Sequence, residues 1–336
     1  MASIPEIPQT VRREILAGPA TAERHAELFD SLGFAAALDR LQARAPLGLA
    51  SDSLRVVAWN AQRCREPARA AEFLRASGAG VFLLSELDAG MARSAQAHTP
   101  RELAGRLGCS AAFAVEFLEL GLGDAQEQRE HAGRENALGW HGGAVLARAD
   151  LLDAEVTRLE RSGRWFDGRL GERRVGTRIA VLSRVALGGR ELALASVHLE
   201  SHSDPDERAA QLAAVFDRLD AWAPGVPALV GGDVNTHSLG LAELEDREAL
   251  RAALARDPGR LADPVAHEPL FALAEARGFA WRAANVRPAP TYKRGGRGAL
   301  QLDWFFARGL AVSDPAVLPS DDLSDHDAIA LSVRLA

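Results

Sequence analysis

Short apolar runs that end in, or contain, a polar residue recur along the chain and predict β-strands. Their richness in Val, Leu and Ala and their polar boundaries are typical of strands buried in a sheet. The runs are Leu54–Asn60, Val81–Glu86, Leu192–His198, Pro227–Asn235, Leu300–Phe306 and Ala328–Val333. If these strands lie side by side, their polar side chains meet on one rim of a sheet sandwich.

Between these strands the apolar residues take the spacing of helices. Residues 67–77 predict a helix that ends at Gly78, and Asp204 caps a second helix whose apolar residues recur at intervals of three and four. Residues 239–278 predict two or three further helices, and residues 9–46 predict a helical segment near the N-terminus. The first two helices therefore connect successive predicted strands.

The most informative strand end is Gly231-Gly232-Asp233-Val234-Asn235. Because alternate side chains of a strand share a face, Asp233 and Asn235 are expected to point the same way. The two glycines are expected to leave room for a ligand to approach the backbone. A carboxylate beside an amide suits hydrolysis of a phosphate ester, where one group takes a proton from water and the other holds a developing oxyanion. The same residues also occur in simple caps and turns, so the interpretation depends on the other strand ends.

Together the strand ends resemble the endonuclease/exonuclease/phosphatase superfamily. The residues that carry the resemblance are Asn60, Glu86, His198, Asp233, Asn235, Asp303 and His326, which occur in the family's order. The resemblance implies an α/β fold, a four-layered sandwich with two packed mixed β-sheets flanked by helices. It implies a catalytic domain over residues 51–336, and the helical extension over residues 1–50 lies outside it.

The resemblance also implies a divalent cation, Mg²⁺ or Mn²⁺. Glu86 is expected to be the principal metal carboxylate, and Asn60 and Asp325 to complete the ligand set; Mg²⁺ prefers such oxygen ligands. Two positions depart from the usual pattern of the family. Gln62 stands where some nuclease members place an acid, and Gly143 stands where an Asn often precedes the Ala. These departures argue against one named subfamily.

The remaining positions receive catalytic roles from the resemblance. Asp233 is expected to orient or deprotonate the attacking water, while Asn235 holds a phosphoryl oxygen. His198 is expected to contact the scissile phosphate. His326 is expected to be a second imidazole on the phosphate, fixed by a hydrogen bond to Asp303.

Composition and charge bound the class of protein. The chain has 336 residues, of which 47% are hydrophobic and 25% are charged, enough to bury one large core. Its net charge is −7 and its pI is near 5.8, so the molecule as a whole repels polyanions. Non-specific binding of long duplex DNA depends on neutralisation of phosphates by Lys and Arg, so the acidic net charge disfavours this function.

Basic residues nevertheless cluster in two places. Seven arginines lie within residues 158–178, together with Trp165 and Phe166, and arginines with interleaved aromatic rings can grip phosphates and stack bases. A second, glycine-rich basic loop covers residues 293–298. The expected contacts to a substrate phosphate are Arg93, Arg178 and Lys293. The alternative for each is ordinary surface charge or a structural salt bridge.

The sequence also bears on location. The first residues lack the pattern of a signal peptide, and no apolar stretch approaches the roughly 18 residues of a membrane span. Cys64 and Cys109 are expected to be reduced thiols. With the Ala, Arg and Gly bias, these features favour a bacterial cytoplasm. Nothing in the sequence indicates the oligomeric state.

Three functions remain open at this point. The first is a metal-dependent phosphodiesterase or nuclease, for which nucleic acid is one candidate substrate. The second is a phosphomonoesterase for a small phosphorylated metabolite or an inositol phosphate, which the acidic net charge favours. The third is a non-catalytic binding protein on the same fold, and the cost of keeping clustered acids without a cation argues against it.

Overall fold

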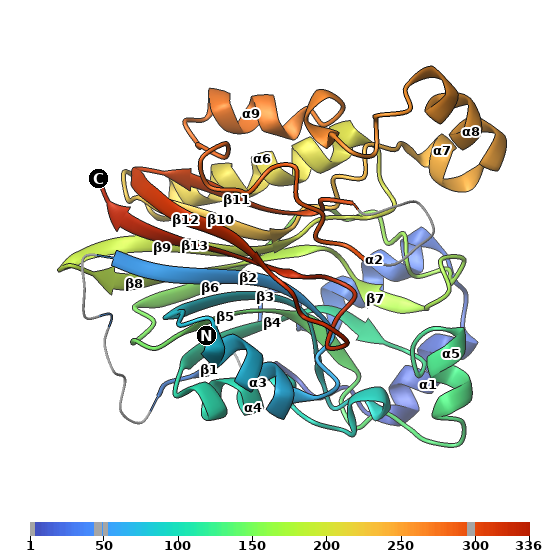
Figure 1. Ribbon diagram of the computed structural model, residues 1–336. Coiled ribbons are helices and arrows are strands. Elements are labelled where there is room, and N and C mark those ends of the chain that lie inside the picture. The colour runs from blue at the N-terminus through green and yellow to red at the C-terminus, as the bar shows by residue number, and fades with distance from the viewer. Residues whose placement is uncertain (1–3, 44–48, 50–52, 294–299) are drawn as a thin grey trace.

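Two β-sheets pack face to face between layers of helices (Figure 1). The computed structural model describes residues 4–43, 49, 53–293 and 300–336. The larger sheet has the order β1-β4-β5-β3-β2-β13-β12, and β7 pairs with β4. Its strands are β1 (Asp39–Leu41), β2 (Ser53–Arg63), β3 (Val81–Ala89), β4 (Ser110–Glu119), β5 (Trp140–Ala147), β7 (Arg174–Gly176), β12 (Leu310–Leu318) and β13 (Ala328–Leu335).

The smaller sheet has the order β11-β10-β9-β8-β6. Its strands are β6 (Asp153–Arg158), β8 (Ile179–Leu187), β9 (Arg190–His198), β10 (Ala228–Asp233) and β11 (Asp303–Arg308). In each sheet one pair is parallel, β2 with β3 and β9 with β10, while the other pairs are antiparallel. Both sheets are therefore mixed, as expected from the sequence.

Helices cover the outer faces of both sheets. Helices α3 (Pro67–Ala76) and α4 (Thr99–Leu107) cover the larger sheet, and α6 (Pro205–Trp222) and α9 (Leu270–Ala276) cover the smaller one (Figure 1). The other helices are α1 (Gln9–Ala17), α2 (Ala22–Ser31), α5 (Ala125–Glu130), α7 (Leu241–Glu245), α8 (Arg247–Arg256) and the 3₁₀ turns η1 (Ala92–Ser94) and η2 (Pro264–Ala266). The expected α/β class is confirmed.

The apolar side chains form three layers of core that correspond to this architecture. The central layer lies between the sheets and includes Leu83, Val145, Val181, Leu194 and Phe305. A second layer lies under α3 and α4, and a third under α6 and α9. Because each strand of the central part is buried on both faces, the polar residues at the strand ends are held on a rigid frame.

The N-terminal segment differs in part from the expectation. Helices α1 and α2 form, but the predicted helix over residues 9–46 is wrong for Asp39–Leu41, which is the strand β1. This strand pairs antiparallel with β4 and covers the edge that β4 would otherwise leave open, which favours a strand over a helix here. Residues 44–48 and 50–52, where the expected domain boundary falls, lie outside the described residues.

Two further expectations concern membranes and thiols. Among the described residues, no helix combines the length and the apolar character needed to cross a membrane. Cys64 and Cys109 are both buried free cysteines.

Candidate active site

The strand pairing of the smaller sheet brings three of the expected residues together. Asp233 at the end of β10 lies opposite His198 on the parallel strand β9 and opposite Asp303 on the antiparallel strand β11. From the larger sheet, Asn60 on β2 pairs with the residue that precedes Glu86 on β3. The two sheets therefore present their polar strand ends to the same rim.

A cavity of about 530 Å³ opens at this rim. Its lining includes Glu86, His198, Asp233, Asn235, Asp325 and His326. Asp325 and His326 come from the loop that precedes β13. The structure thus brings most of the sequence-predicted site residues to one cavity, which is of the size expected for a small-molecule site.

The glycines before Asp233 do not serve the purpose expected from the sequence. A Cβ on Gly231 would lie 2.5 Å from the ring of Phe305, and a Cβ on Gly232 would lie 2.1 Å from the Val197 carbonyl oxygen. The space at both positions is already filled by the neighbouring strands. The glycines therefore allow close packing of β10 between β9 and β11. The expectation that they leave room for a ligand is wrong.

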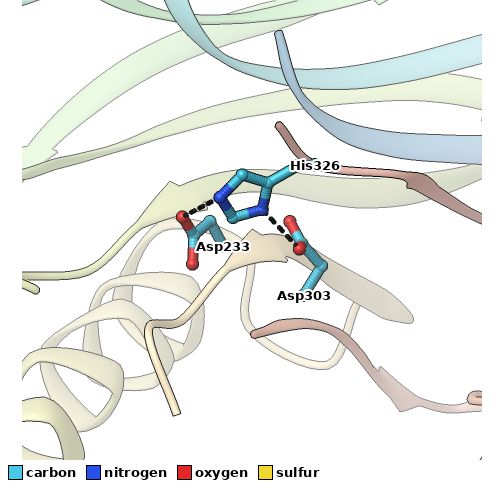
Figure 2. Close-up of side chains that lie close together, drawn as sticks. All are labelled: Asp233, Asp303 and His326. Atoms are coloured by element: carbon cyan, nitrogen blue, oxygen red, sulfur yellow. Dashed lines mark hydrogen bonds and ion pairs between the residues drawn. The ribbon is translucent and has the colours of Figure 1, made fainter. Parts of the chain in front are cut away.

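The Asp233 carboxylate contacts residues from both sheets, and its contact with His326 is visible in Figure 2. Its Oδ2 accepts a hydrogen bond from Asn60 Nδ2 at 3.1 Å and lies 3.7 Å from the Nε2 atoms of both His198 and His326. Its Oδ1 accepts from the backbone N–H of Asn235 at 2.9 Å. Both sheets therefore hold the carboxylate in one orientation.

His326 carries a positive charge at neutral pH. Its Nδ1 lies 2.8 Å from Asp303 Oδ2, the hydrogen bond expected from the sequence (Figure 2). Burial lowers the pKa of His326, but the charges of Asp303 and Asp233 outweigh burial and raise the pKa to about 10. The imidazolium can therefore stabilise negative charge at the mouth of the cavity.

The pKa of Asp233 shifts in the direction that suits a base. Burial raises this pKa, the nearby charge of Asp303 raises it further, and His326 opposes both. A carboxylate with a raised pKa accepts a proton from water more readily than an ordinary one. Asp233 and His326 are therefore a base and a cation held side by side.

His198 is also held by the ion pair between Arg178 and Glu116. Arg178 Nη1 lies 3.1 Å from the imidazole nitrogens, and Glu116 Oε2 lies 3.4 Å from Nδ1. Burial raises the pKa of Glu116, but the charges of His198 and Arg178 outweigh it and lower the pKa to about 2. Arg178 lines the cavity, yet its guanidinium is tied to Glu116 and Glu200 and orients His198.

Asn235 has a backbone with φ of 52°, a left-handed conformation that Asn adopts more easily than most residues. Its Nδ2 donates to the Leu199 carbonyl at 2.9 Å, so the side chain is fixed at the cavity. The contact with Leu199 uses one of the two amide N–H groups and leaves the other for a ligand.

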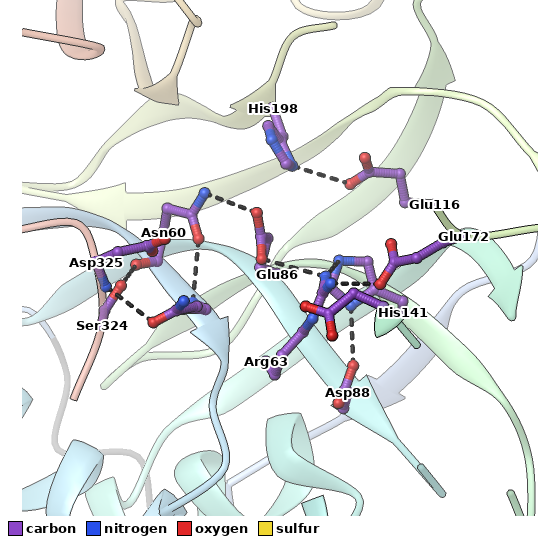
Figure 3. A network of polar contacts seen from close by, with 12 residues as sticks. Asn60, Arg63, Glu86, Asp88, Glu116, His141, Glu172, His198, Ser324 and Asp325 are labelled. Carbon is purple, nitrogen blue, oxygen red and sulfur yellow. Dashed lines mark hydrogen bonds and ion pairs between the residues drawn. The ribbon is translucent and has the colours of Figure 1, made fainter. Parts of the chain in front are cut away.

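Oxygen atoms that could bind a divalent cation lie around Asn60, Glu86 and Asp325 (Figure 3). Asn60 Nδ2 donates to Glu86 Oε1 at 3.1 Å, and the Asp325 amide donates to Gln62 Oε1 at 3.0 Å. Asn60 Oδ1 accepts from the Gln62 amide and keeps a second lone pair. An amide and two carboxylates fit the preference of Mg²⁺ for oxygen.

Glu86 forms an ion pair with Arg63, a residue that the sequence analysis did not single out. Burial raises the pKa of Glu86, but the charge of Arg63 and of the nearby imidazoles outweighs burial and holds the pKa well below its usual range. Arg63 Nη1 lies 3.4 Å from Glu86 Oε2 (Figure 3). Arg63 therefore lies on the Oε2 side of Glu86, and Asn60 lies on the Oε1 side.

A second group of potential metal ligands consists of Asp233, Asp303 and His326, whose donor atoms lie within 4.8 Å of one another. In this group, His326 Nδ1 and Asp303 Oδ2 are already joined by a hydrogen bond of 2.8 Å, which a cation between them would have to replace. The Glu86 side offers oxygen ligands alone, which Mg²⁺ prefers, and we therefore favour it.

Arg93 does not reach the cavity, contrary to the expectation that it contacts a substrate phosphate. Its side chain has no exposed surface, and it forms ion pairs with Asp88, Glu119 and Glu127 at 2.8 to 3.2 Å. The carboxylates come from β3, β4 and α5, so the guanidinium ties three elements together. Arg93 is structural.

Lys293 is also engaged elsewhere. Its Nζ lies 2.7 Å from Asp327 Oδ1 and donates to Ser320 Oγ at 3.0 Å, and it is absent from the cavity lining. The rest of the basic loop, residues 294–298, lies outside the described residues. The geometry therefore gives no support to a substrate contact for Lys293.

Arg93→Lys is expected to lower the free energy of unfolding by about 1–3 kcal/mol, because an ammonium cannot bridge the same carboxylates as a planar guanidinium. KM for a phosphate ester is expected to stay at the wild-type value. Denaturant unfolding and steady-state kinetics measure the two quantities. A raised KM at unchanged stability would restore Arg93 as a substrate contact.

Several residues of the site carried no clear signal in the sequence. Arg63, Glu116, His141 and Glu172 all belong to the polar network beside the cavity (Figure 3). Each lies within or after a predicted strand or in a loop, and its partners are distant in sequence. For Glu116, a charged residue inside an apolar run was the one available signal.

Comparison with known proteins agrees with the family resemblance seen in the sequence. The model of the Endonuclease/Exonuclease/phosphatase family matches residues 57–326. No curated protein sequence matches the chain.

Several solved structures are similar to this chain in fold, although their sequence identity to it is low. An endonuclease/exonuclease/phosphatase from Beutenbergia cavernae has a TM-score of 0.58 and 18% identity, over 84% of this chain and 72% of that chain. The human Nocturnin catalytic domain with bound sulfate has a TM-score of 0.56 and 17% identity, over 89% and 97%. A functionally unknown protein from Enterococcus faecalis has a TM-score of 0.54 and 14% identity, over 84% and 100%.

Proposed function

Because the chain belongs to the endonuclease/exonuclease/phosphatase family, we propose that it is a divalent-metal-dependent hydrolase of phosphate esters that acts on phosphodiesters. The observation that carries the proposal is the position of the Asp233 carboxylate. It lies between two imidazoles and hydrogen-bonds to Asn60, the neighbour of Glu86. A base, two phosphate-facing rings and a metal carboxylate then surround one space.

In this proposal each side chain has one task. Asp233 takes the proton of the attacking water, for which its raised pKa suits it. The His326 imidazolium and His198 stabilise the negative charge that develops on the phosphoryl oxygens, and Asn235 donates to one of them. Asp303 keeps His326 protonated and oriented.

Glu86, Asn60 and Asp325 would hold the cation, Mg²⁺ or Mn²⁺. When bound, the cation supplies Lewis-acid neutralisation of the phosphate charge. Arg63 holds the pKa of the half-buried Glu86 low, so the carboxylate is ionised and can bind a cation.

A second candidate is hydrolysis of a small phosphomonoester, and the arginines of residues 158–178 favour it. Six of the seven contact carboxylates or backbone carbonyls of the protein, so they do not form an open basic groove for a polyanion. The six are Arg158, Arg164, Arg169, Arg173, Arg174 and Arg178. A long nucleic acid is therefore a weaker candidate than a small ester.

A cytoplasmic location is also part of the proposal, supported by the two free thiols.

The proposal predicts that a bis-aryl phosphate diester is hydrolysed in Mg²⁺ or Mn²⁺ and faster than the matching monoester. Chelator is expected to abolish turnover because three oxygen ligands without a cation leave uncompensated negative charge at the phosphate. Release of the aryl alcohol measures both rates. Faster cleavage of the monoester would establish the second candidate, and binding of metal without any turnover would leave a binding protein.

A further inference from the structure

The N-terminal segment before the family match packs against one side of the cavity. Residues 159–178, here called the pocket wall, contribute Trp165, Glu172, Arg174 and Arg178 to the cavity lining. Residues 9–35, here called the brace, contain α1 and α2. We propose that the brace positions the pocket wall and thereby sets the affinity for substrate, an inference that rests on the proposed function of the cavity.

His25 on α2 is the first point of contact. Its Nε2 lies 3.1 Å from the carbonyl oxygen and 3.2 Å from the amide nitrogen of Gly176, so either tautomer finds a partner. The ring lies 5.6 Å from that of Phe166, and a Cβ on Gly163 would lie 2.5 Å from Nδ1. One buried imidazole therefore contacts the beginning, the middle and the end of the pocket wall.

Arg173 is the second point of contact, reaching from the pocket wall to the brace. Its guanidinium donates to the carbonyls of Leu16, Gly18 and Pro19 at 2.6, 3.0 and 3.1 Å. These carbonyls lie where α1 ends, and the last carbonyls of a helix lack partners within the helix. Arg173 satisfies them and joins the two segments.

Arg158, directly before the pocket wall, is the third point of contact. Its Nε donates to the Ala35 carbonyl at 2.7 Å, and its guanidinium lies over the rings of Phe29 and Phe34 at 5.2 and 5.8 Å. Two arginines of the cluster seen in the sequence, Arg158 and Arg173, thus hold the brace.

The pocket wall needs such contacts because it has little regular structure of its own. Within it, β7 is a three-residue strand, and the residues before β7 form turns and bends. Irregular segments keep a single conformation only when tertiary contacts offset their conformational entropy. The brace supplies those contacts on the outer side.

Two neighbouring aromatic residues link the brace to the cavity. Phe166 is buried against His25, whereas Trp165 lines the cavity and donates its indole N–H to Glu200 Oε2 at 2.9 Å. Arg174 lies over the Trp165 ring at 4.8 Å. A shift of Phe166 would therefore move Trp165 and Arg174. The catalytic residues on the strands would stay in place, because the sheets hold them. Arg178, which orients His198, directly precedes β8 and is held by Glu116 and Glu200.

The test uses two variants that cut the brace contacts and two that do not. Arg173→Ala removes the three carbonyl contacts, and His25→Leu removes the contact to Gly176. His25→Gln keeps a donor for the Gly176 carbonyl and is the rescue variant. Arg169→Ala is the matched control, because Arg169 lies on the pocket wall but pairs locally with Asp167 and is exposed.

For the bis-aryl diester, Arg173→Ala and His25→Leu are expected to raise KM by about five- to tenfold, with kcat close to the wild-type value. Amide hydrogen exchange is expected to become faster within residues 159–178 and to stay unchanged in the strands that carry Asp233 and Glu86. His25→Gln and Arg169→Ala should match the wild type in both measurements. Unchanged KM and unchanged exchange in Arg173→Ala and His25→Leu would overturn the proposal, as would faster exchange throughout the chain.

The exchange measurement also separates this inference from the proposed function. If the wild type cleaves no phosphate ester, the proposed function fails, and exchange then decides the inference alone. A rise confined to the pocket wall supports the brace, and its absence overturns it.

Discussion

Asp233→Asn is expected to fold like the wild type and to cleave a phosphate ester about 10² to 10⁴ times more slowly. The substitution keeps the size and shape of the side chain but removes its ability to take a proton. Asn60 and the Asn235 amide both donate to the carboxylate, and one of them loses its acceptor in the variant. Burial already raises the pKa of Asp233, so the fold does not depend on a strongly favoured charge at this position.

Single-turnover rates and thermal unfolding of the variant measure the two expectations separately. Asp206→Asn is the matched control, because Asp206 is an exposed residue in the first turn of α6 and does not line the cavity. A wild-type rate in Asp233→Asn would remove the base from the mechanism. A slow rate accompanied by a large loss of stability would instead assign Asp233 a structural role.

The sequence could predict the strand-end residues of the site, such as Glu86, His198 and Asp233, because each stands at or near the end of an apolar run. It could not predict which strands are neighbours. His198 and Asp233 are adjacent because β9 and β10 pair in parallel with these residues in register. That pairing depends on contacts between distant segments, and local periodicity does not encode it.

Arg93 shows a related limit. In the sequence it lies in a loop shortly after Glu86, where an arginine is usually exposed. In the structure Glu119 and Glu127 approach it from β4 and α5, and Asp88 approaches from β3. The sequence shows that a charge is present, but the number of opposite charges around it depends on the fold.

Dependence on tertiary contacts also explains why the expectations for the glycines before Asp233 and for the N-terminal segment were wrong. Gly231 and Gly232 indicate a close approach, and the sequence does not say whether a ligand or a neighbouring strand makes it. The apolar spacing within residues 9–46 predicts helices, but pairing with β4 decides the conformation of Asp39–Leu41. In both cases a tertiary contact determines the meaning of a local pattern.

Glu86→Gln is expected to weaken the affinity for Mn²⁺ or Mg²⁺ at least about tenfold, since a neutral amide attracts a cation less than a carboxylate does. The fold is expected to persist. Gln can still accept from Asn60, and Arg63 keeps Glu127 and Glu172 as partners. Activity at low metal concentration should fall with the affinity and should recover in part at high metal concentration.

Titration of Mn²⁺ followed by calorimetry measures the affinity directly, without reference to turnover. Asp124→Asn is the matched control for charge, because Asp124 also lines the cavity and an Asn remains a good cap for α5. If both variants weaken the metal equally, the effect is the general field of the cavity, and Glu86 is not a ligand. The group of Asp233, Asp303 and His326 would then become the metal site.

Metal dependence separates Glu86→Gln from Asp233→Asn. A ligand defect is a defect of occupancy, so mass action offsets it when the cation concentration rises. The loss of a base is a defect in the chemical step of a fully occupied site, and no metal concentration restores it. Rescue of Glu86→Gln alone would therefore assign the two carboxylates to different tasks. Rescue of both would place Asp233 among the metal ligands and require a different base.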